Sequence, residues 1–194
     1  MLLRRFTDSD ILQSPRLAKL TWGNFYTHES EELQNLIYGF MVEYYDLNRE
    51  FSFSIVDNGL KGILLAFLKT DNYKMNNFFE RINALSNKTE QETALNLFNY
   101  LEICGKEVKN IINNDDIILG LFVSIQKGCG KQLLSKLIES GRKRNMKNIY
   151  LWTDTTCDYE YYRKNNFVLV KEFETLLNDK PIKTLIYKKT IKPA

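Results

Sequence analysis

A short glycine-containing segment, Gln126-Lys127-Gly128-Cys129-Gly130-Lys131, lies between a strongly apolar run and an amphipathic one. Glycine at such a junction lets the backbone turn tightly and approach a ligand closely, because there is no Cβ in the way. The free N–H groups and the dipole at the start of a helix attract an anion. Lys127 and Lys131 add positive charge. The segment therefore predicts a binding site for a phosphate or a pyrophosphate.

The glycine pair by itself leaves other interpretations open. A glycine-bearing connection that binds no ligand accounts for it equally well. The dinucleotide-binding fingerprint needs a third glycine and an acidic residue about twenty positions later, and the P-loop needs four residues between its glycines followed by Lys-Ser or Lys-Thr. This segment has neither pattern. An unrelated nucleotide-phosphate binder has only the glycines in its favour.

A tyrosine-rich segment, Tyr159–Lys164, holds a second group of residues that could do chemistry. A phenol with a pKa of about 10 is protonated at neutral pH, so it can give a proton to a thiolate leaving group. Packing on a short amphipathic helix is the competing interpretation, because the chain has 11 tyrosines. Cys157 could act as a nucleophile, but His28 is the only histidine, and a Cys–His pair would need it to come from far along the chain.

Hydrophobic periodicity predicts the elements that position these residues. The first part of the chain predicts a strand, two helices and a hairpin, whose turn Asp57-Asn58-Gly59 accepts the positive φ angles of tight turns. The ranges are Leu2–Thr7, Asp8 or Ser9 to about Phe25 with Pro15 delaying the start, Glu31–Tyr45, Phe51–Val56 and Leu60–Leu68. We interpret the aromatic residues Phe40, Tyr44 and Tyr45 as core. The segment Asp71–Asn114, rich in Asn, Glu and Lys, predicts two or three helices as an insertion.

The C-terminal part predicts β–α units. Its first strands are nearly continuous apolar runs, as strands covered on both faces require. The expected order is strand Asp116–Ser124, helix Lys131–Arg144 with Asn145 as a left-handed C-cap, strand Asn148–Thr153, helix Tyr159–Lys164, and strands Val168–Phe173 and Thr184–Ile191.

The bulk composition is typical of one soluble globular domain over residues 1–194, with 44% hydrophobic and 26% charged residues. The net charge of +3 is too even to predict a nucleic-acid partner. The 3 widely spaced cysteines predict neither a disulfide framework nor a zinc site. The longest mainly apolar stretch, Gly62–Leu68, is far short of a membrane span, and the N-terminus has no signal-peptide core. We therefore expect a cytoplasmic protein without membrane, metal or nucleic-acid partners.

The stretch Leu119–Phe173 resembles the second half of a GCN5-related N-acetyltransferase (GNAT) domain. Several features occur in the family's order. They are a strand ending in Leu121-Phe122-Val123, then Gly128-Cys129-Gly130-Lys131 leading into an amphipathic helix, the strand Ile149–Thr153, and Tyr161-Tyr162-Arg163-Lys164-Asn165-Asn166-Phe167, which resembles Phe-Tyr-x-x-x-Gly-Phe. The stretch Thr153–Tyr159 also resembles a Thr-Asp-x-x-Cys-Asn-Tyr variant of some members. The strict match covers about a quarter of the chain.

The resemblance implies an α/β fold with a mixed, mostly antiparallel sheet of six or seven strands, helices on both faces, and a V-shaped cleft between two central parallel strands. It also implies acetyl-CoA as cosubstrate and Tyr162 as the general acid for the CoA thiolate, with Tyr159 and Tyr161 as alternatives. The resemblance also implies the cofactor contacts. The pantetheine arm would bind the backbone of Leu121, Phe122 and Val123, and the pyrophosphate would bind the loop amides of Lys127, Gly128, Cys129, Gly130 and Lys131. Gln126 would replace the family's usual loop residue by a shift in register, and Thr155 would stand where many members have an asparagine.

Acidic residues near two strand ends are candidates for accepting a proton from the amine. Asp116, beside Asp115, precedes the strand that should splay, and we assign it this role, although an ordinary polar loop explains the pair as well. Asp154, at the end of the later strand, is the second candidate.

We therefore predict direct transfer of an acetyl group from acetyl-CoA to a primary amine. The alternative is an acyl-CoA-binding sensor or interaction module that has kept the fold and lost the reaction. The sequence leaves the acceptor open among polyamines, aminoglycosides, amino acids and protein N-termini. It also leaves the oligomeric state open, a homodimer included. The first two helices and the insertion 71–114 are where the family varies its acceptor site, so we expect specificity to come from them.

Overall fold

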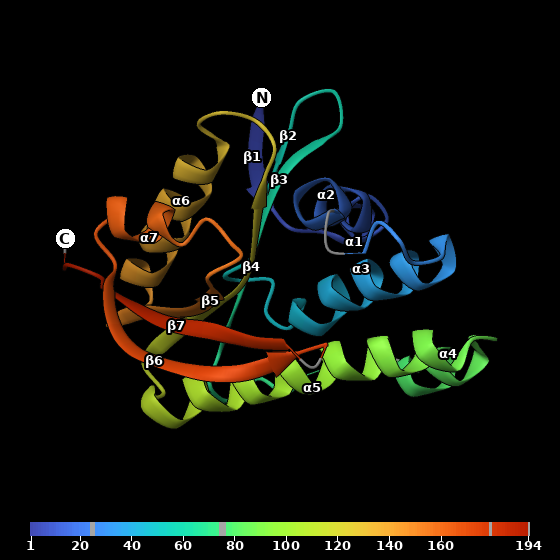
Figure 1. Ribbon diagram of the computed structural model, residues 1–194. Coiled ribbons are helices and arrows are strands. Elements are labelled where there is room, and N and C mark those ends of the chain that lie inside the picture. The colour runs from blue at the N-terminus through green and yellow to red at the C-terminus, as the bar shows by residue number, and fades with distance from the viewer. Residues whose placement is uncertain (24–25, 74–76, 179, 194) are drawn as a thin grey trace.

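The computed structural model describes residues 1–23, 26–73, 77–178 and 180–193. Its sheet has seven strands in the order β1-β2-β3-β4-β5-β7-β6 (Figure 1). Among the described strands, β4 and β5 form the parallel pair and the other neighbours are antiparallel, which confirms the predicted mixed sheet. The strands are β1 Leu2–Arg5, β2 Phe53–Val56, β3 Leu60–Leu68, β4 Asp116–Ser124, β5 Asn148–Asp154, β6 Val168–Leu177 and β7 Lys180–Thr190.

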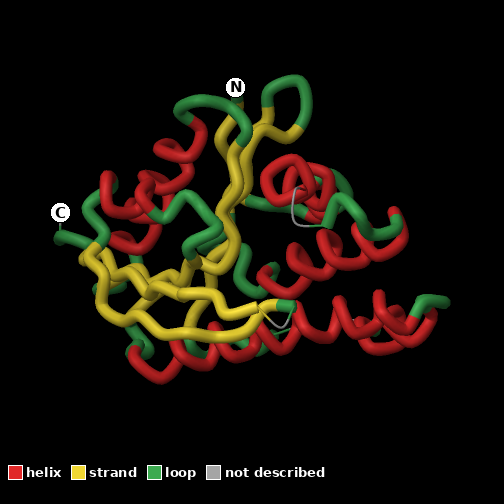
Figure 2. The backbone as a smooth tube through the Cα atoms, viewed as in Figure 1, coloured by secondary structure: helices red, strands yellow, loops and turns green. Residues whose placement is uncertain are grey.

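Helices cover both faces of this sheet (Figure 2). Their bounds are α1 Asp8–Ile11, α2 Ser14–Trp22, α3 Glu31–Tyr45, α4 Phe78–Ala84, α5 Lys88–Ile111, α6 Cys129–Lys143 and α7 Glu160–Lys164. Side chains of α2, α3, α4 and α5 pack in one apolar cluster with one face, and those of α6 and α7 pack in a second cluster with the other. Within the described residues, no helix combines the length and the apolar character needed to cross a membrane.

Some predicted boundaries move. The first predicted helix is broken into α1 and α2, because Pro15 has no N–H to give and is favoured in a first helical turn, where α2 begins. Within the described residues, the insertion holds two helices, α4 and α5, in agreement with the two or three predicted, and α5 alone spans 24 residues. Helix α6 begins at Cys129, before the predicted start at Lys131. Gly128, the last residue of the loop, has a φ of 88°. Part of the predicted first helix, residues 24–25, lies outside the described residues.

A β-bulge at Gly120 separates the two halves of the sheet. Strand β4 pairs with β5 at Asp116, Ile117 and Ile118 and then diverges from it. The register between β4 and β3 skips Gly120, so Leu65 faces Leu121 while Ala66 faces Leu119. An inserted residue bends a strand and increases its twist. Accordingly, in Figure 1 β4 rises with β1, β2 and β3, while β5 runs across with β7 and β6.

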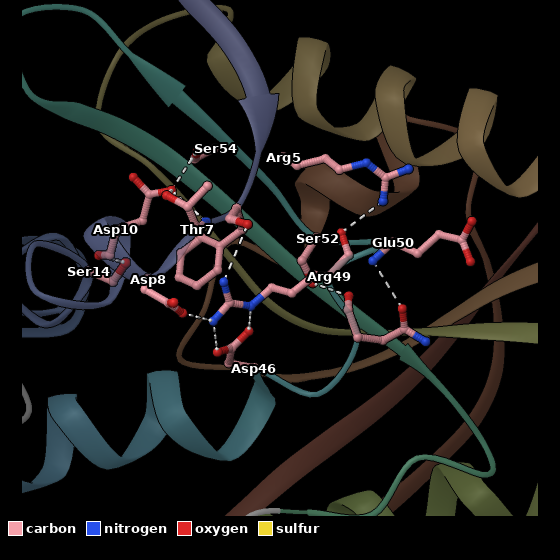
Figure 3. A network of polar contacts seen from close by, with 12 residues as sticks. Arg5, Thr7, Asp8, Asp10, Ser14, Asp46, Arg49, Glu50, Ser52 and Ser54 are labelled. Carbon is pink, nitrogen blue, oxygen red and sulfur yellow. Dashed lines mark hydrogen bonds and ion pairs between the residues drawn. The ribbon is translucent and has the colours of Figure 1, made fainter.

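Polar contacts fix the N-terminal elements beside this opening (Figure 3). Asp10 of α1 accepts hydrogen bonds of 2.6 and 2.7 Å from Arg4 of β1 and of 3.0 Å from Ser54 of β2. Arg49, in the connection from α3 to β2, pairs with Asp46 and with Asp8. These contacts join β1, α1 and β2, and so set where α2 and α3 lie over the sheet.

Candidate functional site

A cavity of about 610 Å³ lies where β4 and β5 diverge. Residues 120–124 of β4 and 152–154 of β5 form its strand walls, Tyr161 and Tyr162 of α7 line one part, and side chains of α2, α3 and α5 line another. The two tyrosines pack with the cluster on the α6 face, whereas Tyr38 and Trp152 pack with the cluster on the opposite face. The cavity therefore passes through the sheet, and two reactants can meet in the gap from opposite faces.

The backbone of β4 presents free groups to this gap. The Ile125 N–H donates to the Lys61 carbonyl of the β3 side at 3.0 Å. Successive residues of an antiparallel strand point their N–H and C=O groups to opposite neighbouring strands. Since Ile125 points these groups toward β3, Phe122 and Ser124 point theirs toward β5. Strand β5 does not pair with them, since its pairing ends opposite Ile118. Of the strand residues expected to bind the pantetheine arm, Phe122 has its backbone facing the gap, while Leu121 and Val123 pair with β3 and line the cavity.

The N-terminus of α6 has the open geometry that an anion needs. Within the described residues, the amides of Gly128, Gly130 and Lys131 have no backbone acceptor, and neither Lys127 nor Lys131 makes an ion pair there. A Cβ at Gly128 would meet no atom within 4 Å, so the space beside this residue is open. The first amides of a helix lack intrahelical partners and carry the positive end of its dipole.

Cys129 differs from its expected role, and the Cα of Gly130 is closely packed although its amide has no backbone acceptor among the residues that the structure describes. The Cys129 N–H donates to the Gln126 carbonyl at 3.1 Å, so this amide closes the turn and is not free for a ligand. The Cys129 side chain is buried. A Cβ at Gly130 would stand 3.2 Å from the Tyr161 hydroxyl and 3.3 Å from Ser124 Oγ, so close packing accounts for this glycine.

Tyr162 lines the cavity from α7 and packs against Phe167 and Tyr161 with ring centroids 5.7 Å away in each case. Burial, assisted by the neighbouring Cys157 and Tyr161, raises the pKa of Tyr162 above that of an ordinary phenol. The hydroxyl is therefore protonated throughout the neutral range. Tyr159, one of the two alternatives, is outside the cavity lining.

Asp154 is the acidic residue that the structure places in the cavity interior. It is 5% exposed and accepts hydrogen bonds from the Tyr100 hydroxyl of α5 at 2.8 Å, from the Thr156 N–H at 2.8 Å and from the Thr156 hydroxyl. Tyr100 was not predicted from the sequence, because its helical spacing does not separate a cavity residue from a core residue.

The placement of Asp116 argues against the role of base. It lies at the end of β4 where β4 and β5 are still paired, several residues from the gap. Its carboxylate is buried and accepts the Asn113 N–H at 2.9 Å and the Asn148 side-chain amide at 2.7 Å. Asp116 thus satisfies backbone and side-chain donors at the closed end of the strand pair.

The remaining candidates are also placed. Thr155 is exposed, donates its N–H to the Lys183 carbonyl and does not line the cavity, unlike Asp154 and Thr156 on either side. His28 is outside the lining. Cys157 lines the cavity, but burial raises the pKa of its thiol, which disfavours the nucleophilic thiolate. In the described part of the chain, no group of three or more His, Cys, Asp or Glu side chains could hold a metal ion.

No protein-family model and no curated protein matches this sequence. Solved structures do. An aminoglycoside 6'-N-acetyltransferase complexed with coenzyme A superposes with a TM-score of 0.58 at 16% identity, covering 100% of this chain and 99% of that one. The ribosomal-protein-S18-alanine N-acetyltransferase from Escherichia coli gives 0.54 at 11% identity, covering 100% and 95%. This chain has the GNAT fold.

A third structure with this fold is the C-terminal condensation domain of Ebony in complex with beta-alanyl-dopamine. It superposes with a TM-score of 0.70 at 12% identity, and the match covers 98% of each chain. At such low sequence identities the likeness defines the fold alone. The chemistry of this chain must therefore be argued from the residues that line its cavity.

Proposed function

We propose that the protein is an acetyl-CoA-dependent N-acetyltransferase. The observation that carries this proposal is the gap between β4 and β5. It is lined from both faces of the sheet and is bordered by unpaired β4 backbone, and two of its lining residues, Ser124 and Tyr161, lie beside Gly130 at the start of α6. A thioester cosubstrate with a diphosphate at one end needs both parts, namely an anion site and an extended peptide-like edge.

The donor would bind from the α6 face. The amides of Gly128, Gly130 and Lys131, with the side chains of Lys127 and Lys131, would hold the diphosphate. The amide groups of the pantetheine arm would add to the free edge of β4 at Phe122 and Ser124, as an extended peptide adds to a sheet edge. The thioester would then lie in the gap, beside Tyr162. An aminoglycoside 6'-N-acetyltransferase of the same fold is complexed with coenzyme A, which supports coenzyme A as the carrier of the acetyl group.

The reaction requires two proton transfers. The neutral amine nitrogen attacks the thioester carbonyl carbon, a C–N bond forms, and a β4 backbone N–H stabilises the oxyanion. The C–S bond then breaks, and the CoA thiolate takes its proton from the Tyr162 hydroxyl. Asp154, which replaces Asp116 in our proposal, accepts the proton that the amine loses, and exchange with water restores both groups.

Calorimetry and a thiol-release assay test the proposal. We expect acetyl-CoA to bind one to one and ATP to bind at least about tenfold more weakly, because ATP lacks the pantetheine arm. Free CoA should appear when a primary amine is added. Binding of acetyl-CoA without turnover on any amine would favour the sensor alternative. Failure to bind acetyl-CoA at all would exclude both interpretations.

A further inference from the structure

The part of the cavity opposite α6 is walled by aromatic rings from three helices, a strand and the connection between α2 and α3. Tyr100 and Trp152 meet edge to face with centroids 5.3 Å apart at 89°, and Tyr26 and Tyr38 meet at 6.2 Å and 78°. The Tyr38 hydroxyl donates to the Trp22 carbonyl at 3.1 Å, which ties α3 to α2. The aromatic residues of this wall are Trp22, Tyr26, Tyr38, Tyr45, Tyr100 and Trp152.

One buried carboxylate lies within this aromatic wall. Among the described residues, Asp154 receives neutral donors only, namely the hydroxyls of Tyr100 and Thr156 and the Thr156 N–H. The described residues that line the cavity include no Lys, Arg or His, and the other acidic residue among them, Asp158, is exposed. A buried carboxylate without a cation is costly. The cavity is therefore complementary to a positive charge.

Another polar group of the same wall, unlike Asp154, has no hydrogen-bond partner in the described part of the chain. The Tyr45 hydroxyl is buried and has no hydrogen-bond partner among the described residues. The Trp152 indole lies beside it without completing a hydrogen bond of normal geometry. Buried polar groups in native proteins usually have partners. The hydroxyl oxygen has less than 1 Å² of accessible surface, so it lies behind the wall and not at the surface that a ligand would contact.

We infer that the acceptor is an arylalkylamine, in which a primary ammonium group is joined by a short aliphatic chain to an aromatic ring. This inference rests on the proposed function and names its substrate class. The ammonium group pairs with Asp154 and lies against the faces of the surrounding rings, where a cation is attracted by their quadrupoles. It then passes one proton through Asp154 to water, and the neutral amine that remains is the nucleophile of the proposed reaction. The ring packs edge to face or offset among the aromatic residues of α2, α3 and α5.

Other amines fit this wall less well. A polyamine or an aminoglycoside carries several cations and many polar groups, which would lie against aromatic and aliphatic surface beside one buried carboxylate. A peptide N-terminus brings polar backbone groups for which the wall offers few partners. Each would lose hydration without equivalent compensation.

A substrate panel tests the inference with the full chain. Acetyl transfer is measured with 2-phenylethylamine, 2-cyclohexylethylamine, putrescine, kanamycin and an N-terminal alanyl peptide. We expect kcat/KM for 2-phenylethylamine to exceed that for 2-cyclohexylethylamine about tenfold, because the two share the ammonium group and the chain but only one has a π face. Equal values for the two, or a higher value for putrescine, kanamycin or the peptide, would overturn the inference while leaving the acetyltransferase proposal intact.

Binding measured without turnover separates the two proposals. In calorimetry, 2-phenylethylamine should bind the protein without acetyl-CoA, and Asp154→Asn should weaken this binding about tenfold while acetyl-CoA binding is unchanged. Trp152→Leu should weaken binding of 2-phenylethylamine more than that of 2-cyclohexylethylamine, and Trp152→Phe should restore the difference. If wild-type protein binds acetyl-CoA but Asp154→Asn binds the amine as tightly as wild type, the ammonium site is elsewhere and the inference fails.

Discussion

The Tyr100 hydroxyl donates a 2.8 Å hydrogen bond to Asp154, and this contact joins the insertion helix α5 to the end of β5. Both residues line the cavity. The insertion therefore does more than cover the sheet, because it supplies a donor to a deeply buried carboxylate of the cavity. In the proposed mechanism, this contact couples recognition of the amine to proton transfer through a segment whose composition differs from that of the rest of the chain.

Removing this hydrogen bond should affect the amine and spare the donor. We expect Tyr100→Phe to lower kcat/KM for the amine about fivefold to tenfold, because Asp154 loses one of its fixing donors. The acetyl-CoA dissociation constant should not change. Steady-state kinetics and calorimetry on the same preparation check this, and an equal loss of acetyl-CoA binding would show that the substitution has disturbed the fold.

Tyr162→Phe should lower kcat about a hundredfold, since a positioned general acid contributes roughly that factor. Acetyl-CoA should still bind. The matched control is Tyr159→Phe, which changes a tyrosine outside the cavity lining on the same short segment. A similar loss in both variants would point to packing of α7 and not to acid catalysis.

The pH profile gives an independent check on Tyr162. Because burial raises its pKa above the ordinary value of about 10, the proton that it donates remains in place across the neutral and mildly alkaline range. We expect kcat not to fall between pH 7 and pH 9.5 through loss of this proton. A decline of wild-type kcat in that interval that Tyr162→Phe abolishes would contradict the assignment.

Lys127→Gln with Lys131→Gln should weaken acetyl-CoA binding about tenfold, with a smaller salt dependence than wild type, because two exposed charges near a diphosphate are removed. S-acetylpantetheine, which lacks the diphosphate, is the matched ligand. Its kcat/KM should be the same for the double variant and wild type. An equal effect on both donors would mean that the lysines act through the loop structure.

Gly120→Ala should destabilise the protein by about 1–3 kcal/mol, because a Cβ there would overlap the Tyr45 ring and stand 2.7 Å from Phe67. Turnover should also fall, since displaced Tyr45 lines the cavity. Gly23→Ala is the control, as its Cβ would meet only Lys19 at 3.8 Å. Urea unfolding measures both, and equal stability of the two variants would contradict the packing at the bulge.

The buried pair of Arg4 and Asp10 should make stability depend on pH. Burial acts to raise the pKa of Asp10, but the hydrogen bonds from Arg4, Thr7 and Ser54 outweigh it and lower the pKa below the ordinary value. The stabilisation is therefore present above pH 4, near the unfolded pKa, and is lost as the pH falls through the folded pKa. Asp10→Asn should cost about 2 kcal/mol at pH 7.

Urea unfolding at pH 7 and at successively lower pH measures this effect. The difference between Asp10→Asn and wild type should shrink below pH 4. Asp8→Asn, at a side chain that is 94% exposed, should change stability little at either pH. A constant difference for Asp10→Asn down to pH 2 would show that shape, and not charge, accounts for the role of this residue.

Local patterns predict much of the fold correctly because they depend on nearest neighbours. Helix α3 spans Glu31–Tyr45 and β4 spans Asp116–Ser124, as periodicity and apolar run length predict. Asn58 and Gly59 adopt positive φ angles of 49° and 106° in the hairpin turn, as Asn-Gly predicts. Asn166 has a φ of 60°, at the position that corresponds to the glycine of Phe-Tyr-x-x-x-Gly-Phe, the motif that residues 161–167 resemble.

Three features follow from the amino-acid sequence alone, namely the order of the elements, the glycine loop at the start of α6 and the position of Tyr162 in its motif, because each is a short-range pattern. Which carboxylate meets the cavity depends on how the strands are arranged in space. Asp116 and Asp154 look alike as acidic residues at the ends of neighbouring parallel strands. The bulge at Gly120 opens one end of the strand pair and leaves the other closed, so Asp154 faces the gap and Asp116 does not. The aromatic wall likewise required contacts among helices distant in sequence, which no local periodicity encodes.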